Sequence, residues 1–257
     1  MKRILTLAIT IASTLTGYSQ SLGYTDLGVL FSKDDNFGTA RFEAMSGAVG
    51  ALGGDRSAFS INPAGSVVAK SSSFGLTFNS RNTEYKAKYY GNTSVTEDNY
   101  FNVSQAGGIL VFDTAYNSEW NRFALTFNYR LKSDYEGLFS INGNSGQALF
   151  NEHPDDTNNQ FDNGILQNFR NSTYGDSSIF EMGFAAVHQN KLHIGLGLNF
   201  YDLNFSQRSN LSEFNNDTNG NELDAFLYQE NFTTGTGFSA NAGFIYKAHQ
   251  SFRFGIA

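Results

Sequence analysis

Apolar and polar side chains alternate with a period of two through most of residues 72–257. Successive side chains of a β-strand point to opposite faces, so this period predicts strands with one apolar and one polar face. The clearest case is 120–132, where an aromatic and aliphatic face opposes one carrying arginines and small polar residues. The same pattern predicts about seven strands, over 72–90, 100–112, 120–132, 179–188, 191–205, 232–247 and 252–256.

The connections between these segments differ in length. Those at 113–119, 189–190 and 248–250 are short, those at 133–178 and 206–231 are long and polar, and 91–99 is intermediate. Alternating short turns and long loops are typical of bacterial outer-membrane β-barrels. The alternation holds throughout if 72–90 is one long bent strand rather than a hairpin, and we therefore expect one strand there. Gly107 and Gly108 are candidates for a kink or bulge in the wall.

Composition supports a sheet that is apolar on one face and seldom charged on the other. Charged residues make up 16% of the 257 residues, there are 26 Gly and 2 Pro, and the net charge is -7. The negative charge and the lack of a Lys/Arg cluster argue against nucleic acid as a partner. The absence of Cys excludes disulfides and cysteine-bound metals.

The N-terminus has the three-part organisation of a secretory signal peptide. Lys2 and Arg3 precede the apolar run Ile4–Ala12, and small and polar residues follow as far as Gln20. We expect a signal peptide over 1–19, cleaved after Ser19; the alternative is a buried N-terminal helix or strand. No segment has 18 consecutive apolar residues, so membrane insertion of the exported chain would be as a β-barrel.

The stretch from Arg41 to Gly65 does not alternate. It is crowded with Gly, Ala and Ser and ends in Asn62-Pro63-Ala64-Gly65. Small residues at 44, 47, 48, 50, 51, 53 and 54 would let a backbone pack closely against a barrel wall and against itself. Pro63 keeps Asn62 out of the α region, so a helix should end there. We expect residues 20–71 to form an internal hatch and 72–257 a partial barrel; the alternative is a Gly/Ala-rich surface helix and turn of an ordinary domain.

The chain resembles the FadL/TodX family of outer-membrane transporters for hydrophobic compounds, in its Bacteroidota form. The resemblance rests on the following segments: Gly38-Thr39-Ala40-Arg41, Ala44-Met45-Ser46-Gly47-Ala48, Leu52-Gly53-Gly54-Asp55 and Asn62-Pro63-Ala64-Gly65. It is specific over Gly38–Gly65 and architectural beyond. It implies an all-β fold, a transmembrane antiparallel barrel of fourteen strands around an N-terminal hatch. Single-chain bacterial barrels close with an even number of strands, so seven strands predict the N-terminal half of a longer protein.

The resemblance implies passive uptake of small hydrophobic molecules such as long-chain fatty acids across the outer membrane. The hatch would rearrange around Asn62, Pro63, Ala64 and Gly65, with no enzyme activity, cofactor or energy source. The alternatives are a protein-binding outer-membrane component of a secretion system, whose partner is a secreted protein, and a non-specific porin. The apolar residues of the longest loop are candidate ligand contacts, although self-packing of the loop explains them equally: Leu138, Phe139, Leu149, Phe150, Phe161, Ile165, Leu166 and Phe169.

Two other patterns carry little chemistry. Asn215, Asp217 and Asn219, followed by Gly220, have the spacing that begins a calcium loop, but the twelfth position is Phe226 rather than Glu. A solvated acidic loop is therefore the simpler interpretation. The four His residues show no metal-ligand spacing. The sequence predicts no metal, cofactor or catalytic residue.

Overall fold

The structure is a computed structural model that describes residues 23–116, 118–153 and 155–257. The predicted signal peptide over 1–19 lies outside the described residues. The chain divides into one unit up to Lys33 and a second, much larger unit from Asp34 to Ala257. The first contains helix α2 (Tyr24–Ser32), where the Asp26 carboxylate accepts a hydrogen bond from the Gly23 amide. Among the described residues, no helix has the length and apolarity needed to cross a bilayer.

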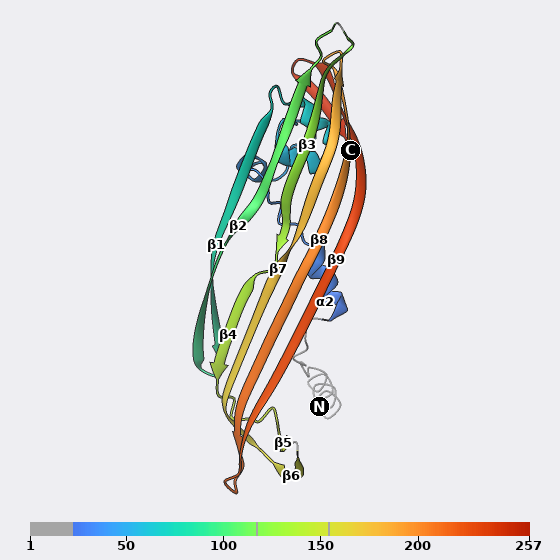
Figure 1. Cartoon of the computed structure of the whole chain (residues 1–257). Helices are drawn as coiled ribbons and strands as arrows, with labels where there is room; N and C mark the ends of the chain where they lie inside the picture. The colour runs from blue at the N-terminus through green and yellow to red at the C-terminus, as the bar shows by residue number, and fades with distance from the viewer. Residues whose placement is uncertain (1–22, 117, 154) are drawn as a thin grey trace, which may run out of the picture. The chain divides into compact units, whose positions relative to one another are not determined.

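The second unit is built on one antiparallel sheet, which curls into half a barrel (Figure 1). Short β4 (Gly137–Gly143) pairs with β7 beyond the end of β3, and β5 (Glu152–His153) pairs with β6 (Asp156–Gln160) in a separate ribbon. The strands of the main path are, in spatial order, β1 (Ser73–Tyr89), β2 (Asn92–Asp113), β3 (Trp120–Asp134), β7 (Asn163–His188), β8 (Leu192–Asn216), β9 (Glu222–His249) and β10 (Phe252–Ile256).

The main path contains every predicted strand. Residues 73–89 form one strand rather than a hairpin, with a register shift between Thr77 and Phe78. The short connections after β2, β7 and β9 all lie at one end of the sheet, which we call the turn end; it lies near the label C in Figure 1. The predicted all-β class is therefore confirmed.

The predicted loops at 133–178 and 206–231 were wrong. Both regions are largely strand, because β4 and the first half of β7 occupy the former and β8 and β9 extend across the latter to a turn at 217–221. The predicted connection at 91–99 is likewise part of β2, which follows a tight turn at Tyr90 and Gly91, both with positive φ. Most of these strand extensions carry polar side chains on both faces, so they lack the sustained apolar alternation by which strands are recognised.

The two faces of the sheet have the predicted character near the turn end. On β8, Leu196 and Leu198 are exposed on the convex face, whereas Gly195, Gly197 and Asn199 are buried on the concave face. The same division holds on β3, where Leu125 and Phe127 are exposed and their neighbours are buried.

Residues 34–71 lie against the concave face and contain only short helical turns. These are α3 (Ala40–Ala44), η1 (Arg56–Ser60) and η2 (Pro63–Val68). Phe42, Val49 and Ala58 form a small apolar core of their own. We call residues 34–71 the inner segment.

Candidate functional site

The Asn62–Gly65 stretch is the point at which the inner segment is held to the sheet. Asn62 is extended, with φ -149° and ψ 107°, and caps η2 by accepting a hydrogen bond from the Ala64 amide at 3.0 Å. Its amide nitrogen donates to the Gly50 carbonyl at 2.9 Å and to the Phe244 carbonyl of β9 at 3.2 Å. Asn62 therefore joins two parts of the inner segment to the wall, and the predicted end of the preceding helix at this position is confirmed.

Glycines on the concave face provide the seat for this stretch. A Cβ built on Gly195 of β8 would lie 2.7 Å from the Pro63 carbonyl oxygen, and one on Gly255 of β10 would lie 3.0 Å from the Gly50 carbonyl oxygen. A Cβ on Gly243 of β9 would lie 3.0 Å from Asn62 Cγ. Cβ atoms essentially never approach as closely as at Gly195 and Gly243, and the contact at Gly255 would be tight, so glycine at these positions lets the inner segment reach the sheet.

Phe59 of η1 also packs against glycines of the wall, slightly farther from the turn end than Asn62–Gly65. Its ring is fully buried and lies against Gly183 of β7 and Gly197 of β8, where a Cβ on Gly197 would approach within 2.8 Å. The glycines of the wall and the aromatic ring of the inner segment therefore have complementary shapes.

The η2 turn crosses several strands beyond Asn62. Ser66 accepts a hydrogen bond from the Thr126 hydroxyl of β3 at 2.7 Å. Val67 packs against a buried apolar cluster on the wall, formed by Ile109, Ala124, Ala185 and Val187. Around η2 the inner segment is consequently anchored by apolar contact and a few hydrogen bonds.

The inner segment is also tied to itself. The Thr39 hydroxyl lies 2.8 Å from both carboxylate oxygens of Asp55, and the Thr39 amide donates to Ser57 Oγ at 2.8 Å. Gly53, at φ 60°, packs directly on the backbone of Gly65, which the Gly54 amide also reaches at 2.8 Å. The small residues around 53 and 54 thus serve the close backbone packing that the sequence predicts for them.

A row of polar side chains follows the concave face beyond Phe59. Gln105 of β2 donates to Asn128 Oδ1 at 2.7 Å, and Asn128 of β3 donates to Glu181 Oε2 at 2.6 Å. Glu181 of β7 lies opposite Asn199 of β8 in the strand register. Both are buried, and Glu181 Oε1 and Asn199 Oδ1 have no hydrogen-bond partner among the described residues.

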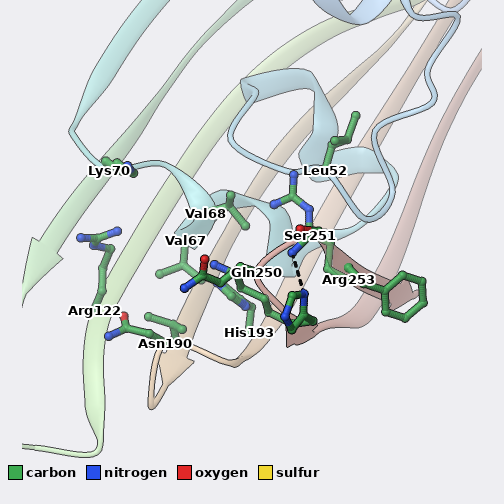
Figure 2. A pocket seen from close by; sticks show the side chains of 14 residues that line it. Leu52, Val67, Val68, Lys70, Arg122, Asn190, His193, Gln250, Ser251 and Arg253 are labelled. Atoms are coloured by element: carbon green, nitrogen blue, oxygen red, sulfur yellow. Dashed lines mark hydrogen bonds between the residues drawn. The ribbon is translucent and has the colours of Figure 1, made fainter.

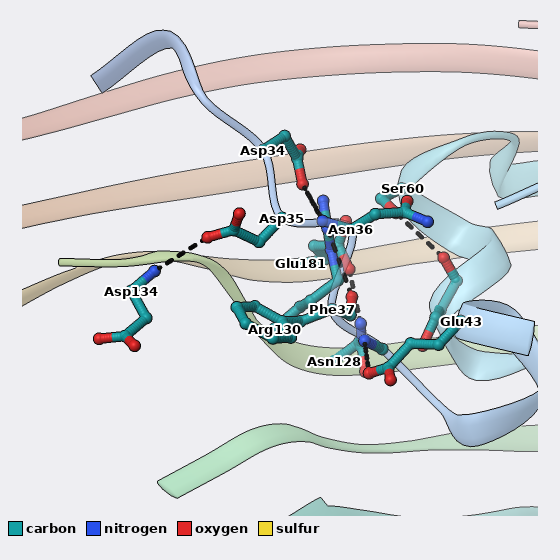
Figure 3. A network of polar contacts seen from close by, with 12 residues as sticks. Asp34, Asp35, Asn36, Phe37, Glu43, Ser60, Asn128, Arg130, Asp134 and Glu181 are labelled. Atoms are coloured by element: carbon teal, nitrogen blue, oxygen red, sulfur yellow. Dashed lines mark hydrogen bonds and ion pairs between the residues drawn. The ribbon is translucent and has the colours of Figure 1, made fainter. Parts of the chain in front are cut away.

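The inner segment covers this polar row with its own polar groups (Figure 3). Arg130 of β3 reaches the Asp34 carboxylate at 3.3 Å and the Phe37 carbonyl at 3.4 Å. The Asp35 amide donates to the Lys132 carbonyl at 2.8 Å. Residues 34–37 therefore run along β3 and shield Glu181 and Asn128 from solvent.

The predicted ligand-contact residues do not form one pocket. Phe139 of β4 and Phe169 of β7 have ring centroids 6.3 Å apart, but Leu149 and Leu166 are more than half exposed and Phe161 is buried. Leu138 is half-buried on β4, Ile165 on β7, and Phe150 precedes β5. The region packs partly on itself, as the alternative interpretation expects.

The structure gives Gly107 and Gly108 no register shift. The pairing of β2 with β1 and with β3 continues regularly through both residues, and the irregularity lies at Ser104, which is skipped between Val103 and Gln105. Gly107 instead allows close approach of the β3 backbone, since its Cβ would lie 2.6 Å from the Phe127 carbonyl.

The Asp217 turn is satisfied by its own residues. The Asp217 carboxylate accepts hydrogen bonds from the amides of Asn219 and Asn221 at 2.8 and 2.7 Å, and from both of their side chains. Within the described ranges, no group of three or more His, Asp or Glu side chains is arranged to hold a metal ion.

Sequence reasoning assigned no role to the wall glycines or the polar row. A signal was present, because Gly183, Gly195, Gly197, Gly243 and Gly255 all occupy the polar-face positions of adjacent strands. Only the strand register shows that they form one patch under the inner segment.

Comparison with models of known protein families, with curated proteins and with solved structures finds no match to this chain.

Proposed function

We propose that this chain forms part of the wall and the internal hatch of an outer-membrane β-barrel that admits small hydrophobic molecules. The proposal rests on the polarity of the two faces of the sheet, which is the reverse of that in a soluble protein. Its convex face exposes large apolar side chains near the turn end, while its concave face buries polar ones under the inner segment.

The convex face suits lipid better than water. Phe74, Leu196 and Phe238 are 78, 63 and 63% exposed, and comparable residues on each strand of the main path extend the apolar surface into a continuous band. Soluble monomers rarely expose contiguous apolar patches of more than a few hundred Å². The rest of the band consists of Leu76, Phe78, Leu110, Phe112, Leu125, Phe127, Phe180, Phe184, Ile194, Leu198, Phe200, Tyr246, Phe252, Phe254 and Ile256.

The band is densest in the turn-end part of each long strand. On β8 it runs from Ile194 to Phe200, and on β9 from Phe238 to Tyr246, with Phe232 also exposed farther along β9. A tilted strand crosses a bilayer with about 9–11 residues, whereas β9 has 28. The remaining residues of β7, β8 and β9 would extend as a polar hairpin array beyond the membrane, with the short turns on the periplasmic side.

A bilayer leaves no backbone group of a spanning sheet unpaired. The proposal therefore requires that the outer edges of β1 and β10 are paired by further strands in the assembled protein. The inner segment would then lie within the lumen.

Passage of a ligand would require the inner segment to move relative to the wall. The contacts that hold it are suited to this, since Asn62, Ser66 and Val67 make hydrogen bonds and apolar contacts that can exchange. The glycine seat has no side chains of its own to obstruct the movement.

A reversible crosslink tests the proposal. The chain has no cysteine, and the Thr126 and Ser66 hydroxyls are 2.7 Å apart, so the pair Ser66→Cys and Thr126→Cys can tie the inner segment to the wall. In liposomes that hold the full-length protein, oxidation should stop uptake of a labelled long-chain fatty acid, and reduction should restore it.

The matched control is a wall-to-wall crosslink. Ser209 Oγ donates to Asn171 Oδ1 at 2.7 Å between paired strands, so Asn171→Cys with Ser209→Cys adds a disulfide without fixing the inner segment. Equal inhibition by both crosslinks would refute the hatch mechanism. Absence of fatty-acid uptake by the unmodified protein, or equal uptake of hydrophilic sugars, would refute the transport function.

A second candidate function is that of a protein-binding outer-membrane component for a secreted partner. The polar extensions of β7, β8 and β9 favour it, because they exceed the length that a bilayer requires. Removal of residues 206–231 at the end of the β8–β9 hairpin should then abolish co-purification of secreted proteins and leave fatty-acid uptake unchanged.

A further inference from the structure

A positively charged cleft lies at the turn end of the sheet, between the inner segment and the wall. Its volume is about 690 Å³, and Figure 2 shows Lys70 and Arg122 on one side and the Gln250–Arg253 turn on the other. The Ser251 amide donates to His249 Nδ1 at 3.4 Å and so helps to shape that turn.

Cations dominate the lining of the cleft. Lys70, Arg122, Lys247 and Arg253 line it together with two histidines, and no Asp or Glu does. The one carboxylate that approaches these cations in the described part of the chain is Asp113, whose Oδ1 lies 2.7 Å from Arg122 Nε. In a protein of net charge -7, such a concentration of positive charge needs a counter-charge.

Lys70, Arg122, Lys247 and Arg253 all line the same cleft. Like charges in one lining repel one another, and an anion bound among them weakens that repulsion. The charge of the lining therefore favours an anion as the ligand.

The remaining lining is apolar or carries neutral donors. Leu52, Val67 and Val68 come from the inner segment and Phe252 from β10, while Asn190 and Ser251 add hydrogen-bonding groups. The volume exceeds that of a bare oxyanion and falls in the usual range for small-molecule sites. The ligand should therefore combine a doubly charged head with an apolar substituent.

We propose that this cleft binds a phosphate monoester, with Arg122 and Arg253 as the principal phosphate ligands and Lys70 and Lys247 as supporting charges. Guanidinium groups bind phosphate oxygens in a bidentate manner, and ammonium groups act as point charges. A carboxylate would leave most of the positive charge uncompensated. The apolar substituent would contact Val68 and Phe252. The inference is independent of the proposed transport function.

The test is calorimetric titration of the purified full chain in detergent with phenyl phosphate and, separately, with inorganic phosphate. We expect saturable binding, tighter for phenyl phosphate, and at least about tenfold weaker for Arg253→Gln because a charge-assisted hydrogen bond is lost. Lys70→Gln should weaken binding less. Arg208→Gln is the matched control, since Arg208 pairs with Glu230 on distant parts of β8 and β9, and its affinity should be unchanged.

Two further arms identify the source of the phosphate and guard against misfolding. Saturable binding of short-chain phosphatidic acid, with none of short-chain phosphatidylcholine, would assign a lipid headgroup; binding of phenyl phosphate alone would assign a soluble monoester. Arg253→Lys should retain part of the affinity if the fold is intact. Absence of saturable phosphate binding by the unmodified chain, or equal losses for Arg253→Gln and Arg208→Gln, would overturn the proposal.

Discussion

The inward side chains of the long strands β7, β8 and β9 make different contacts in the two halves of each strand. In the seated half, residues 177–188 of β7, 192–200 of β8 and 238–249 of β9, the concave face is covered by the inner segment. In the far half, residues 163–176, 201–216 and 222–237, exposed apolar side chains such as Leu166, Phe226 and Phe232 lie among polar side chains on both faces.

The difference lies in what the inward side chains contact. In the seated half they are reduced to glycine at Gly195 and Gly243, so that another segment of chain can approach. In the far half they bond to one another, as Gln207 does with Asn171 at 2.9 Å. A strand can therefore be stabilised either by a segment that packs on it or by polar pairs across its own ladder.

Substitution of matched glycines provides the strongest test of this comparison. Gly195→Ala places a methyl group against the backbone of Pro63 and Ala64, and we expect a loss of about 3 kcal/mol in unfolding free energy from overpacking. Gly235→Ala in the far half meets only Leu203, at 3.7 Å, and should change stability by less than about 0.5 kcal/mol. Urea unfolding in detergent measures both.

Limited proteolysis separates local from global effects of the glycine substitutions. If the seat matters locally, Gly195→Ala should expose residues 34–71 to protease before the sheet unfolds. Equal protease sensitivity and equal stability of the two variants would contradict the distinction between the halves.

Loss of the Asn62 side chain should have the next largest effect. Asn62→Ala removes one cap and two hydrogen bonds to part-buried carbonyls, and we expect destabilisation of roughly 2 to 3 kcal/mol. Asn219→Ala, in the exposed turn of the far half, removes contacts with Asp217 that water replaces, and should cost less than about 0.5 kcal/mol. Similar losses in the same unfolding assay would show that Asn62 is not a special anchor.

Two buried glutamates, one in each half, show how the two halves accommodate a carboxylate. Glu213 of the far half accepts hydrogen bonds from the amides of Leu149 and Phe150 and from the Gln167 side chain. Glu213→Gln replaces one accepting oxygen with an NH₂ group that faces these donors, and it should lower the unfolding free energy by about 2 kcal/mol. Glu181 of the seated half has one oxygen without a partner, opposite Asn199 Oδ1. Glu181→Gln supplies a donor there and should raise stability by about 1 kcal/mol. Changes of the same sign would contradict this assignment.

The seated half was predictable from sequence, and most of the far half was not, although the strands predicted at 191–205 and 232–247 extend into it. Alternation at Leu196, Leu198 and Phe200 marks a strand because one face meets an apolar phase and the other a polar one. At Gln207, Ser209 and Ser212 both faces are polar, so the residues that form a paired strand look like loop residues.

The site was predictable in part for a related reason. Asn62 and Pro63 have strong local preferences that are visible in the chain itself. Gly195 packs against residue 63, and Gly243 packs against Asn62. Such pairs are far apart in sequence, so their contact depends on the sheet register and on where the inner segment lies, which local patterns do not specify.

The smallest expected effect concerns the exposed ion pair of the far half. Arg208 Nε lies 2.8 Å from Glu230 Oε1, and the hydrogen bond and charge of Arg208 lower the pKa of Glu230 below its ordinary value of 4.5. A carboxyl whose folded pKa is lowered stabilises the fold above its unfolded pKa, and this contribution disappears as pH falls through the folded pKa. Because both side chains are exposed, solvent screens the pair and any change in unfolding free energy should be small. NMR titration of the Glu230 carboxyl carbon should nevertheless show its pKa rise in Arg208→Gln, with no shift in Lys86→Gln, whose partner is Glu84. An unchanged Glu230 pKa would mean that the far-half ladder holds its charges apart in solution, leaving its neutral amide pairs to stabilise it.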